Sequence, residues 1–279
     1  MPLHLKQTFR EDLAQQRGPE EQRGAAQARP LAGMWLCSGS PVAAEIAAGS
    51  GLDWLLLDME HSPVTLSSLL AQLQAIAAYP ITPMVRIPVG DTVIIKQVLD
   101  LGAQNLLVPM VSTAEHARSM VEAVHYPPRG RRGVGSALSR SARWNRVEGY
   151  LGDAAQHVSL FVQIESAEAV ENIEEILAVD GIDGIFVGPS DLSASMGLLG
   201  QQSHPDVVAA VRHCVAAAGA AGIPAGVNAF DPDVARGYAE DGVDFLLVGA
   251  DVSLLARGSE ALAAQWVPTE QDESGRASY

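Results

Sequence analysis

The stretch GLDWLLLDMEHSPVTLSSLLAQLQAIAAYPITPMVRIP, residues 51–88, contains two short apolar runs separated by a segment with helical spacing. The runs at 53–58 and 82–88 lack the alternation of apolar and polar residues that a half-exposed strand shows, so each is predicted to be a strand buried on both faces. The segment at 66–79 repeats its apolar residues at the spacing of a helix. A strand, a helix and a second strand in this order predict a parallel βαβ unit.

The same unit recurs along the chain. Strand-like runs occur at residues 31–37, 53–58, 82–88, 104–110, 158–165, 181–188, 223–228 and 244–249. Segments with helical spacing separate most of them, including 92–102, 166–179 and 206–222. This alternation predicts an α/β fold of the (β/α)8 TIM-barrel type. A doubly wound open sheet is the alternative, but no GxGxxG motif follows the first run.

The composition fits one domain between two polar ends. A chain of 279 residues with 48% hydrophobic content can bury one large core, and a single α/β barrel commonly has this length. We predict an N-terminal arm at 1–29, the barrel at 30–267 and a polar C-terminal tail at 268–279. The arm can form a short amphipathic helix, but its sequence indicates no role.

Charge and cysteine content restrict the partners and the compartment. A net charge of −15 and a pI near 4.8 argue against binding to nucleic acid or to anionic membranes. The sequence has neither an apolar run of membrane-spanning length nor a signal-like apolar core at the N-terminus. Its two cysteines, Cys37 and Cys214, form no CxxC motif, so neither disulfides nor a thiolate metal site is indicated. We therefore expect a cytoplasmic protein with no nucleic-acid or membrane partner.

Polar side chains gather at the ends of the predicted strands. Catalytic groups of TIM barrels come from the C-terminal ends of several strands, so these residues are expected to meet on one rim. The residues at those ends are Asp58, Glu60 and His61, then Arg86, Gln163 and Glu165, residues 188–191, Asn228 and Asp251.

Glu165 and Asp191 follow neighbouring strands and can face each other across about one strand spacing. Two carboxylates, with other positions left to water and substrate, suit a hard divalent cation. The alternative is that one of the two carboxylates is the N-cap of the helix that follows it, a role that suits either, and that the other is an ion-pair partner. The sequence Gly188-Pro189-Ser190 exposes backbone N–H groups at a helix start, an arrangement that favours an anion such as a carboxylate.

Arg86 and His61 complete the predicted chemistry. A guanidinium inside the apolar run PMVRIP needs an anionic partner, which is either a substrate or a structural carboxylate. His61 is a natural proton acceptor near neutral pH, and a neighbouring carboxylate would increase its basicity. Asp58 and Asp100 are the two candidates for that carboxylate.

The positions of the lysines argue against a Schiff base. The chain has only Lys6, in the arm, and Lys96, in the helix after the third strand, and neither ends a strand. An amine nucleophile is therefore missing from the rim, so carbonyl chemistry at this site is expected to be metal-assisted.

Several motifs together resemble one enzyme family. The segments DWLLLDMEHSP, PMVRIP, IKQVLDLGAQNLLVPMV, YPPRGRRGVGSALSRSARWNR, VQIES and VDGIFVGPSDLSASMG are similar to those of the HpcH/HpaI family of metal-dependent pyruvate aldolases. The resemblance covers residues 31–265 and is greatest to 4-hydroxy-2-oxoheptanedioate aldolases. It implies cleavage of a 4-hydroxy-2-oxo acid to pyruvate and an aldehyde such as succinic semialdehyde.

The resemblance also implies the roles of individual residues. Glu165 and Asp191 would bind the divalent metal, which is Mg²⁺, Mn²⁺ or Co²⁺. His61 would accept the proton and Arg86 would stabilise the transition state. Gln163, Gly188, Ser190 and Asp191 would bind the substrate, and Asp100 would increase the basicity of His61. The family's barrels form hexamers, as trimers of dimers, in which neighbours exchange their last helix.

The chain departs from close relatives at a few positions. Met59 and Ser190 stand where relatives often have Gly and Ala, which bears on the preference for the aldehyde. Arg140, Arg143 and Arg146 form either a solvated basic loop or a region that attracts an acidic aldehyde. The alternatives for the function are an aldolase for 2-keto-3-deoxy sugar acids, a retro-Claisen acyl-CoA lyase and a binding protein for 2-oxo acids without catalytic activity.

Overall fold

The computed structural model describes residues 3–18 and 29–267, and the predicted tail at 268–279 lies outside the described residues. Eight parallel strands form one closed barrel in chain order, and β8 pairs with β1. Each strand overlaps a predicted run, so the TIM-barrel prediction is confirmed. The strands are β1 (Leu31–Leu36), β2 (Trp54–Asp58), β3 (Thr82–Arg86), β4 (Asn105–Val108), β5 (Ser159–Ile164), β6 (Gly184–Val187), β7 (Ala225–Asn228) and β8 (Phe245–Ala250).

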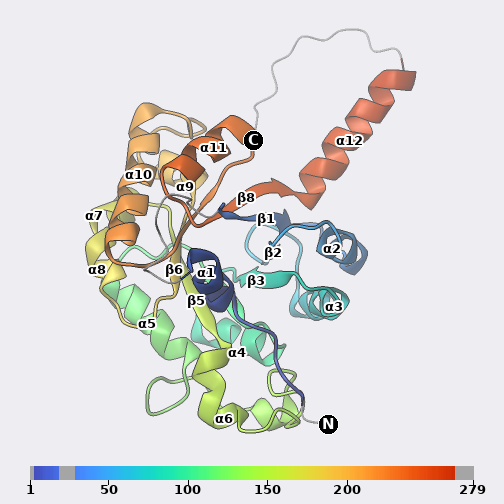
Figure 1. The fold of residues 1–279 in the computed structure, drawn as a ribbon, viewed down its shortest axis with the longest axis vertical. Coiled ribbons are helices and arrows are strands. Elements are labelled where there is room, and N and C mark those ends of the chain that lie inside the picture. The colour runs from blue at the N-terminus through green and yellow to red at the C-terminus, as the bar shows by residue number, and fades with distance from the viewer. Residues whose placement is uncertain (1–2, 19–28, 268–279) are drawn as a thin grey trace.

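Helices surround the barrel in Figure 1. Polar residues start several of them: Thr65, Asp91 and Asp231 each accept hydrogen bonds from backbone N–H groups of the first helical turn. The helices are α1 (Phe9–Arg17), α2 (Pro41–Ala48), α3 (Leu66–Ile76), α4 (Thr92–Asp100), α5 (Ala114–Val124), α6 (Tyr150–Asp153), α7 (Ala167–Glu171), α8 (Ile173–Leu177), α9 (Pro189–Ser195), α10 (Pro205–Ala220), α11 (Pro232–Glu240) and α12 (Asp251–Trp266).

Two apolar layers hold the barrel together. The outer layer lies between the strands and the surrounding helices, and the inner layer fills the barrel with large side chains. Inside the barrel, a Cβ atom at Gly226 would overlap the ring of Phe245, so glycine at this position makes room for the aromatic side chain. The strands are buried on both faces, as the continuous apolar runs predict.

Helix α1 closes the N-terminal end of the barrel, a role that sequence reasoning did not find for the arm. Phe9 and Leu13 are fully buried and belong to the inner layer. The Phe9 ring lies 5.0 Å from that of Trp54 and 5.3 Å from that of Phe245, measured between centroids. In Figure 1, α1 lies in front of the strands and across the opening that they surround. The active end of the barrel must therefore be the opposite one.

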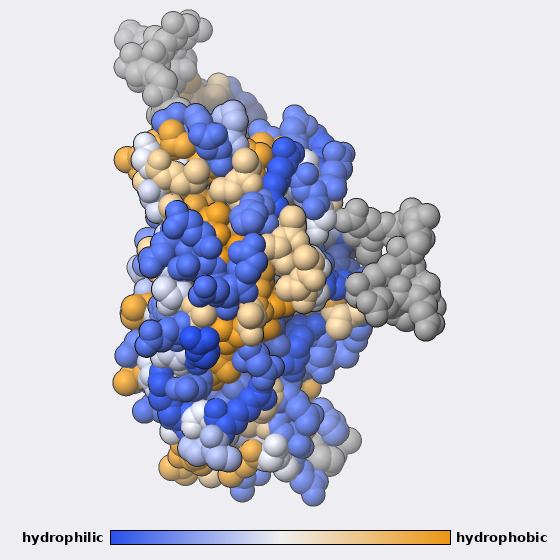
Figure 2. Space-filling model, turned by 90° about the vertical axis from the view of Figure 1, so that its left-hand side faces the viewer, coloured by the Kyte–Doolittle hydropathy of each residue, from blue (hydrophilic) through white to orange (hydrophobic). Residues whose placement is uncertain are grey.

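Two surfaces outside the barrel are apolar. Helix α12 points away from the body of the molecule in Figure 1, and none of its residues is buried. Figure 2 faces the left-hand side of Figure 1 and shows a band of hydrophobic residues between hydrophilic ones. The exposed apolar side chains of α12 are Val252, Leu254, Leu255, Leu262 and Trp266.

Among the described residues, no helix combines the length and the apolar character that crossing a bilayer requires.

Candidate active site

A buried ion pair joins the ends of β2 and β3. Asp58 and Arg86 are register partners, and Nε and Nη2 of Arg86 donate to the two carboxylate oxygens of Asp58 over 2.8 Å and 2.9 Å. The guanidinium also lies 4.3 Å from the centroid of the Trp35 ring. Asp58 is thus the structural partner of Arg86, and its side chain also accepts the backbone N–H groups of Glu60 and His61 over 3.0 Å and 3.3 Å.

Glu60 is the carboxylate that contacts both Arg86 and His61. Its Oε2 lies 3.0 Å from Nη1 of Arg86, and its Oε1 lies 3.9 Å from Nε2 of His61. The Glu60 side chain is 16% exposed, whereas that of His61 is 65% exposed. Burial raises the pKa of Glu60 above its ordinary value, and Arg86 and His61 oppose this rise. Sequence reasoning placed Glu60 on the rim but assigned it no function.

Glu165 lies directly after β5 and is almost fully buried. Its Oε1 accepts the backbone N–H of Met110 over 2.7 Å, and its Oε2 accepts the side-chain amide of Gln163. Burial raises the pKa of Glu165 to about 7, because the bond from Met110 opposes the rise only in part and the charges of Glu60 and Asp191 add to it. Met110, in the left-handed conformation with φ 55°, was not predicted from the sequence.

Asp191 lies in the exposed first turn of α9, beside Glu165. Neither carboxylate is an N-cap, because Gly188 is the N-cap of α9 and Ser166 caps α7 by accepting the backbone N–H of Ala169. A Cβ atom at Gly188 would lie 2.8 Å from the amide of Gln163 and 2.9 Å from Oε2 of Glu165. Glycine at this position therefore leaves room for the buried pair, and the helix-capping alternative is wrong for both carboxylates.

Two of the predicted substrate-binding residues, Gln163 and Ser190, differ in their hydrogen bonding. Oε1 of Gln163 is buried and has no hydrogen-bond partner among the described residues. Ser190 is exposed, and its hydroxyl accepts the side-chain amide of Gln202 over 3.1 Å. No side chain caps the start of α9. A buried acceptor without a partner is costly, which indicates that a ligand or water completes this site.

Asp100 does not meet His61 within one chain. It ends α4, and Nη2 of the fully buried Arg132 lies 3.2 Å from its Oδ1. Helix α4 runs back from the end of β3 to the start of β4, so its last residue lies toward the N-terminal end of the barrel. The carboxylate that contacts His61 in the chain is that of Glu60, and neither of the two predicted candidates makes this contact.

Other predicted polar residues have structural contacts. Asp251 accepts the backbone N–H groups of Cys37 and Ser38 over 2.8 Å and 3.1 Å, which joins the ends of β8 and β1. Asn228 accepts the indole N–H of Trp35 over 2.7 Å. Arg140 donates to the Leu101 carbonyl at the end of α4, and Arg143 donates to the carbonyl of Arg140. The basic loop is therefore packed against α4, and burial lowers the pKa of Arg140 to about 10.

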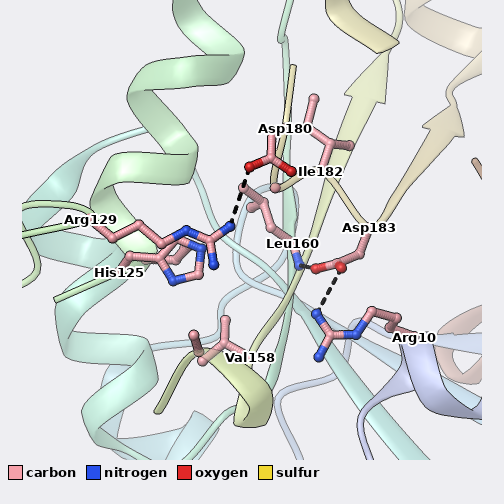
Figure 3. A pocket seen from close by; sticks show the side chains of 11 residues that line it. Arg10, His125, Arg129, Val158, Leu160, Asp180, Ile182 and Asp183 are labelled. Carbon is pink, nitrogen blue, oxygen red and sulfur yellow. Dashed lines mark hydrogen bonds and ion pairs between the residues drawn. The ribbon is translucent and has the colours of Figure 1, made fainter. Parts of the chain in front are cut away.

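A cavity of about 240 Å³ lies at the opposite end of the barrel, where β5 and β6 begin (Figure 3). Arg10 forms an ion pair of 2.9 Å with Asp183 there, and Arg129 lies 3.8 Å from Asp180. None of the predicted site residues lines this cavity. Asp180 and Asp183 of this cavity each have their own guanidinium partner, whereas Asp58 and Glu60 of the rim share Arg86.

The rim is rich in negative charge. Asp58, Glu60, Glu165 and Asp191 interact electrostatically there, and Arg86 is a cationic neighbour of the first three. In the part of the chain that the structure describes, no cluster of three or more His, Cys, Asp or Glu residues is arranged to hold a metal ion. The two carboxylates that the sequence predicted as ligands of a divalent cation, Glu165 and Asp191, both belong to this charged group.

Comparisons with known proteins identify the family to which the chain belongs. A family model described as HpcH/HpaI aldolase/citrate lyase matches residues 31–258. The chain is 52% identical over 246 residues to a hydroxypyruvate/pyruvate aldolase of Deinococcus radiodurans, covering 88% of this chain and 89% of the relative. It is 51% identical over 238 residues to a 4-hydroxy-2-oxo-heptane-1,7-dioate aldolase of Salmonella dublin, covering 85% and 90% of the two chains.

A solved structure gives the same result. An HpcH/HpaI aldolase/citrate lyase family protein from Burkholderia cenocepacia J2315 superposes with a TM-score of 0.82 and 41% identity, over 85% of this chain and 94% of that one. The family that the sequence motifs predicted is therefore confirmed. By its sequence and its fold, this chain belongs to the HpcH/HpaI aldolase/citrate lyase family.

Proposed function

We propose that the protein is a class II aldolase that cleaves a 4-hydroxy-2-oxo acid to pyruvate and an aldehyde, and that joins the two in the reverse reaction. One observation carries the metal-dependent chemistry: Asp58, Glu60 and Glu165 have the guanidinium of Arg86 as a common cationic neighbour, and Asp191 adds a further negative charge beside them. Family membership and the aldolase names of the two relatives support the reaction class.

The residues at the rim fit a divalent cation. The carboxylates of Glu165 and Asp191 repel each other, and the unpaired Oε1 of Gln163 lies beside them. A cation would relieve this repulsion, and oxygen ligands suit Mg²⁺, Mn²⁺ or Co²⁺. We assign Glu165 and Asp191 as the residues that hold it. Bound there, the cation supplies Lewis-acid stabilisation of the charge that develops on the 2-oxo group.

The side chains of the rim supply the remaining steps. His61 accepts the proton of the 4-hydroxyl group, and the bond between C3 and C4 breaks as its electrons move to the 2-oxo oxygen. Arg86 donates a hydrogen bond to that oxygen, because Asp58 occupies only two of its five N–H donors. Backbone N–H groups of Ser190 and Asp191, together with Gln163 and the space left by Gly188, bind the carboxylate end of the substrate.

The active site is proposed to be completed by a second copy of the chain. Asp100 is held by Arg132 away from His61 of its own chain, so it can approach only the His61 of a neighbour. The unburied α12 offers the apolar surface for such an assembly. We propose that the protein forms a homo-oligomer, namely a hexamer built as a trimer of dimers.

We also propose a cytoplasmic location, which is supported by the two free cysteines.

The acceptor is proposed to be an aldehyde such as succinic semialdehyde. Met59 packs in the outer apolar layer, so its side chain is not available to select the aldehyde. Ser190 is exposed at the rim and is the better candidate for that selection. The relative named hydroxypyruvate/pyruvate aldolase makes hydroxypyruvate a second donor to test. A retro-Claisen acyl-CoA lyase is the alternative function, and no other observation favours it.

Pyruvate release tests the proposal. The purified protein is incubated with Mg²⁺, Mn²⁺ or Co²⁺ and a 4-hydroxy-2-oxo acid, and pyruvate is measured through lactate dehydrogenase. Pyruvate and a panel of aldehydes are then combined in the reverse direction. Release of pyruvate from acyl-CoA substrates alone, or from none of them, would contradict the aldolase assignment.

Borohydride trapping separates metal-assisted chemistry from a Schiff base. Lys6 contacts the carbonyl of Tyr79, and Lys96 lies on α4 near Gly133, so neither amine reaches the rim. Treatment with borohydride and pyruvate is expected to leave full activity and no covalent adduct. A pyruvate-derived mass increase on either lysine, with loss of activity, would reverse the argument.

A further inference from the structure

We propose that Glu60 is a positioning residue that holds Arg86 and His61 in one arrangement at the active rim. This inference rests on the aldolase function proposed above. It concerns a rim carboxylate to which sequence reasoning gave no role, and it differs from the proposed role of Asp100 because Glu60 acts within its own chain.

Two hydrogen bonds, from the N–H groups of Met59 and Glu60, hold the backbone that leads into Glu60. Its own N–H donates to Oδ1 of Asp58 over 3.0 Å, and the N–H of the preceding Met59 donates to the carbonyl of Arg86 over 2.9 Å. The turn after β2 is thus tied to the end of β3. The direction in which the Glu60 side chain leaves the backbone follows from these two bonds.

The side chain of Glu60 lies between the two functional groups. Oε2 is 3.0 Å from Nη1 of Arg86, while Oε1 is 3.9 Å from Nε2 of His61. Oε2 is buried and makes no aligned hydrogen bond among the described residues, so its contact with Arg86 is an ion pair only. Glu60 therefore links the two side chains by charge, one through each carboxylate oxygen.

Arg86 does not need Glu60 for neutralisation. Asp58 already binds the guanidinium with both oxygens, and a second carboxylate adds burial cost and repulsion from Asp58 and Asp191. A glutamine at position 60 would fill the same volume at a lower electrostatic cost. The charge of Glu60 has a use, however, when His61 takes up a proton, since the imidazolium then has an anionic neighbour.

The main test is the Glu60→Gln variant, with the exposed Glu240→Gln at the end of α11 as a matched control. Aldol cleavage by Glu60→Gln is expected to fall about 10- to 100-fold, with little change in the concentration of substrate needed for half-saturation. The acid limb of the pH–rate profile should move to lower pH, because the imidazolium loses its neighbouring charge. Glu60→Asp, which keeps the charge, should recover part of the lost activity and of the acid limb.

Other charged groups near His61 and Glu60 also influence the pH–rate profile. They are Asp58, Arg86, Glu165 and Asp191. In a His61→Ala background, adding Glu60→Gln should cost much less than it costs alone, because two residues that act together are not additive. Equal losses in both backgrounds, with an unmoved acid limb, would overturn the proposal.

A crystal structure of Glu60→Gln gives a readout that does not depend on turnover. Rotation of the His61 ring, or of the Arg86 Nη1 group, away from position 60 is expected. Unchanged positions of both side chains would also overturn the proposal. A wild-type protein that releases no pyruvate would contradict the proposed function, while the crystal structures would still decide whether Glu60 positions the two residues.

Discussion

The two ends of the barrel use the same types of residue in opposite ways. At the N-terminal end, Asp183 pairs with Arg10 at 2.9 Å and Asp244 pairs with Arg17 at 2.7 Å. At the C-terminal end, Glu60, Glu165 and Asp191 interact as like charges, and Arg86 is the guanidinium near Glu60 and Glu165. Paired carboxylates stabilise the fold, whereas a group of under-neutralised carboxylates is ready to bind a cation.

The apolar contacts differ in the same way. Phe9 and Leu13 of α1 are fully buried at the N-terminal end. At the C-terminal end, a buried polar atom, Oε1 of Gln163, has no partner among the described residues. The comparison teaches that one end of the molecule is built for stability and the other for binding, and each of the following experiments tests this division.

The largest effect is expected from removing divalent cations. Exhaustive chelation should abolish turnover, and Mg²⁺, Mn²⁺ or Co²⁺ should restore it, because the charges of Glu165 and Asp191 repel each other and a bound cation would offset this repulsion. Circular dichroism should show that the chelated protein remains folded, since the N-terminal end holds the barrel. Full activity in the chelated protein would contradict the proposal that the C-terminal end binds a cation required for turnover.

Arg86→Ala and His61→Ala should fail in different ways. Arg86→Ala should lower aldol turnover by roughly 10²–10³-fold, the loss typical of one transition-state donor, and His61→Ala by roughly 10²–10⁴-fold. Decarboxylation of oxaloacetate needs stabilisation of the enolate but no base for a hydroxyl group, so it should survive His61→Ala better than Arg86→Ala. Both activities are measured with each variant, and equal losses would end the division of roles.

Phe9→Ala should affect stability and leave the chemistry intact. Removal of a fully buried aromatic ring is expected to lower the free energy of unfolding by about 3–5 kcal/mol. Turnover per folded molecule should be nearly that of the wild type, because Phe9 lies at the end away from the rim. Urea unfolding and activity are compared with Leu3→Ala, which truncates a side chain that is 40% exposed. A large loss of turnover in the folded variant would show that the two ends are coupled.

The smallest expected effect concerns His125 at the N-terminal end. Burial lowers its pKa from 6.5 to about 4, with Arg129 and Arg10 adding to the decrease. Between these two values the unfolded chain binds more protons than the folded one, so stability is lost as the pH falls through this window. His125→Gln should reduce that loss by on the order of 1–2 kcal/mol. Urea unfolding at pH 7 and pH 5 measures the loss of stability in the wild type and in the variant. Equal losses in the two proteins would show that His125 is not the cause.

The sequence predicted the strands well because their signals are local. Continuous apolar runs at 53–58 and 158–165 became β2 and β5, within a residue or two at each end. The polar residues that follow these runs were identified for the same reason, since a strand end and a polar side chain are both visible in the chain itself. The family motifs added the expected roles of the residues.

The contacts among those residues could not be read from local signals. Glu60 was known to follow β2, yet its position between Arg86 and His61 depends on the pairing of β2 with β3. The bond from Met110 to Glu165 joins the ends of β4 and β5. Asp251 was expected on the rim as a polar residue, but it holds the ends of β8 and β1 together.

The sequence by itself determined that this chain alternates strands and helices, that it ends its strands with carboxylates, an arginine and a histidine, and that no lysine is available among them. Only the tertiary structure decided that α1 closes one end of the barrel, that Asp100 is held away from the His61 of its own chain and that Glu60 takes that place. The physical reason is that hydrophobic periodicity is a property of neighbouring residues, whereas burial, ion pairing and the resulting pKa values depend on which strand ends the closed barrel brings together.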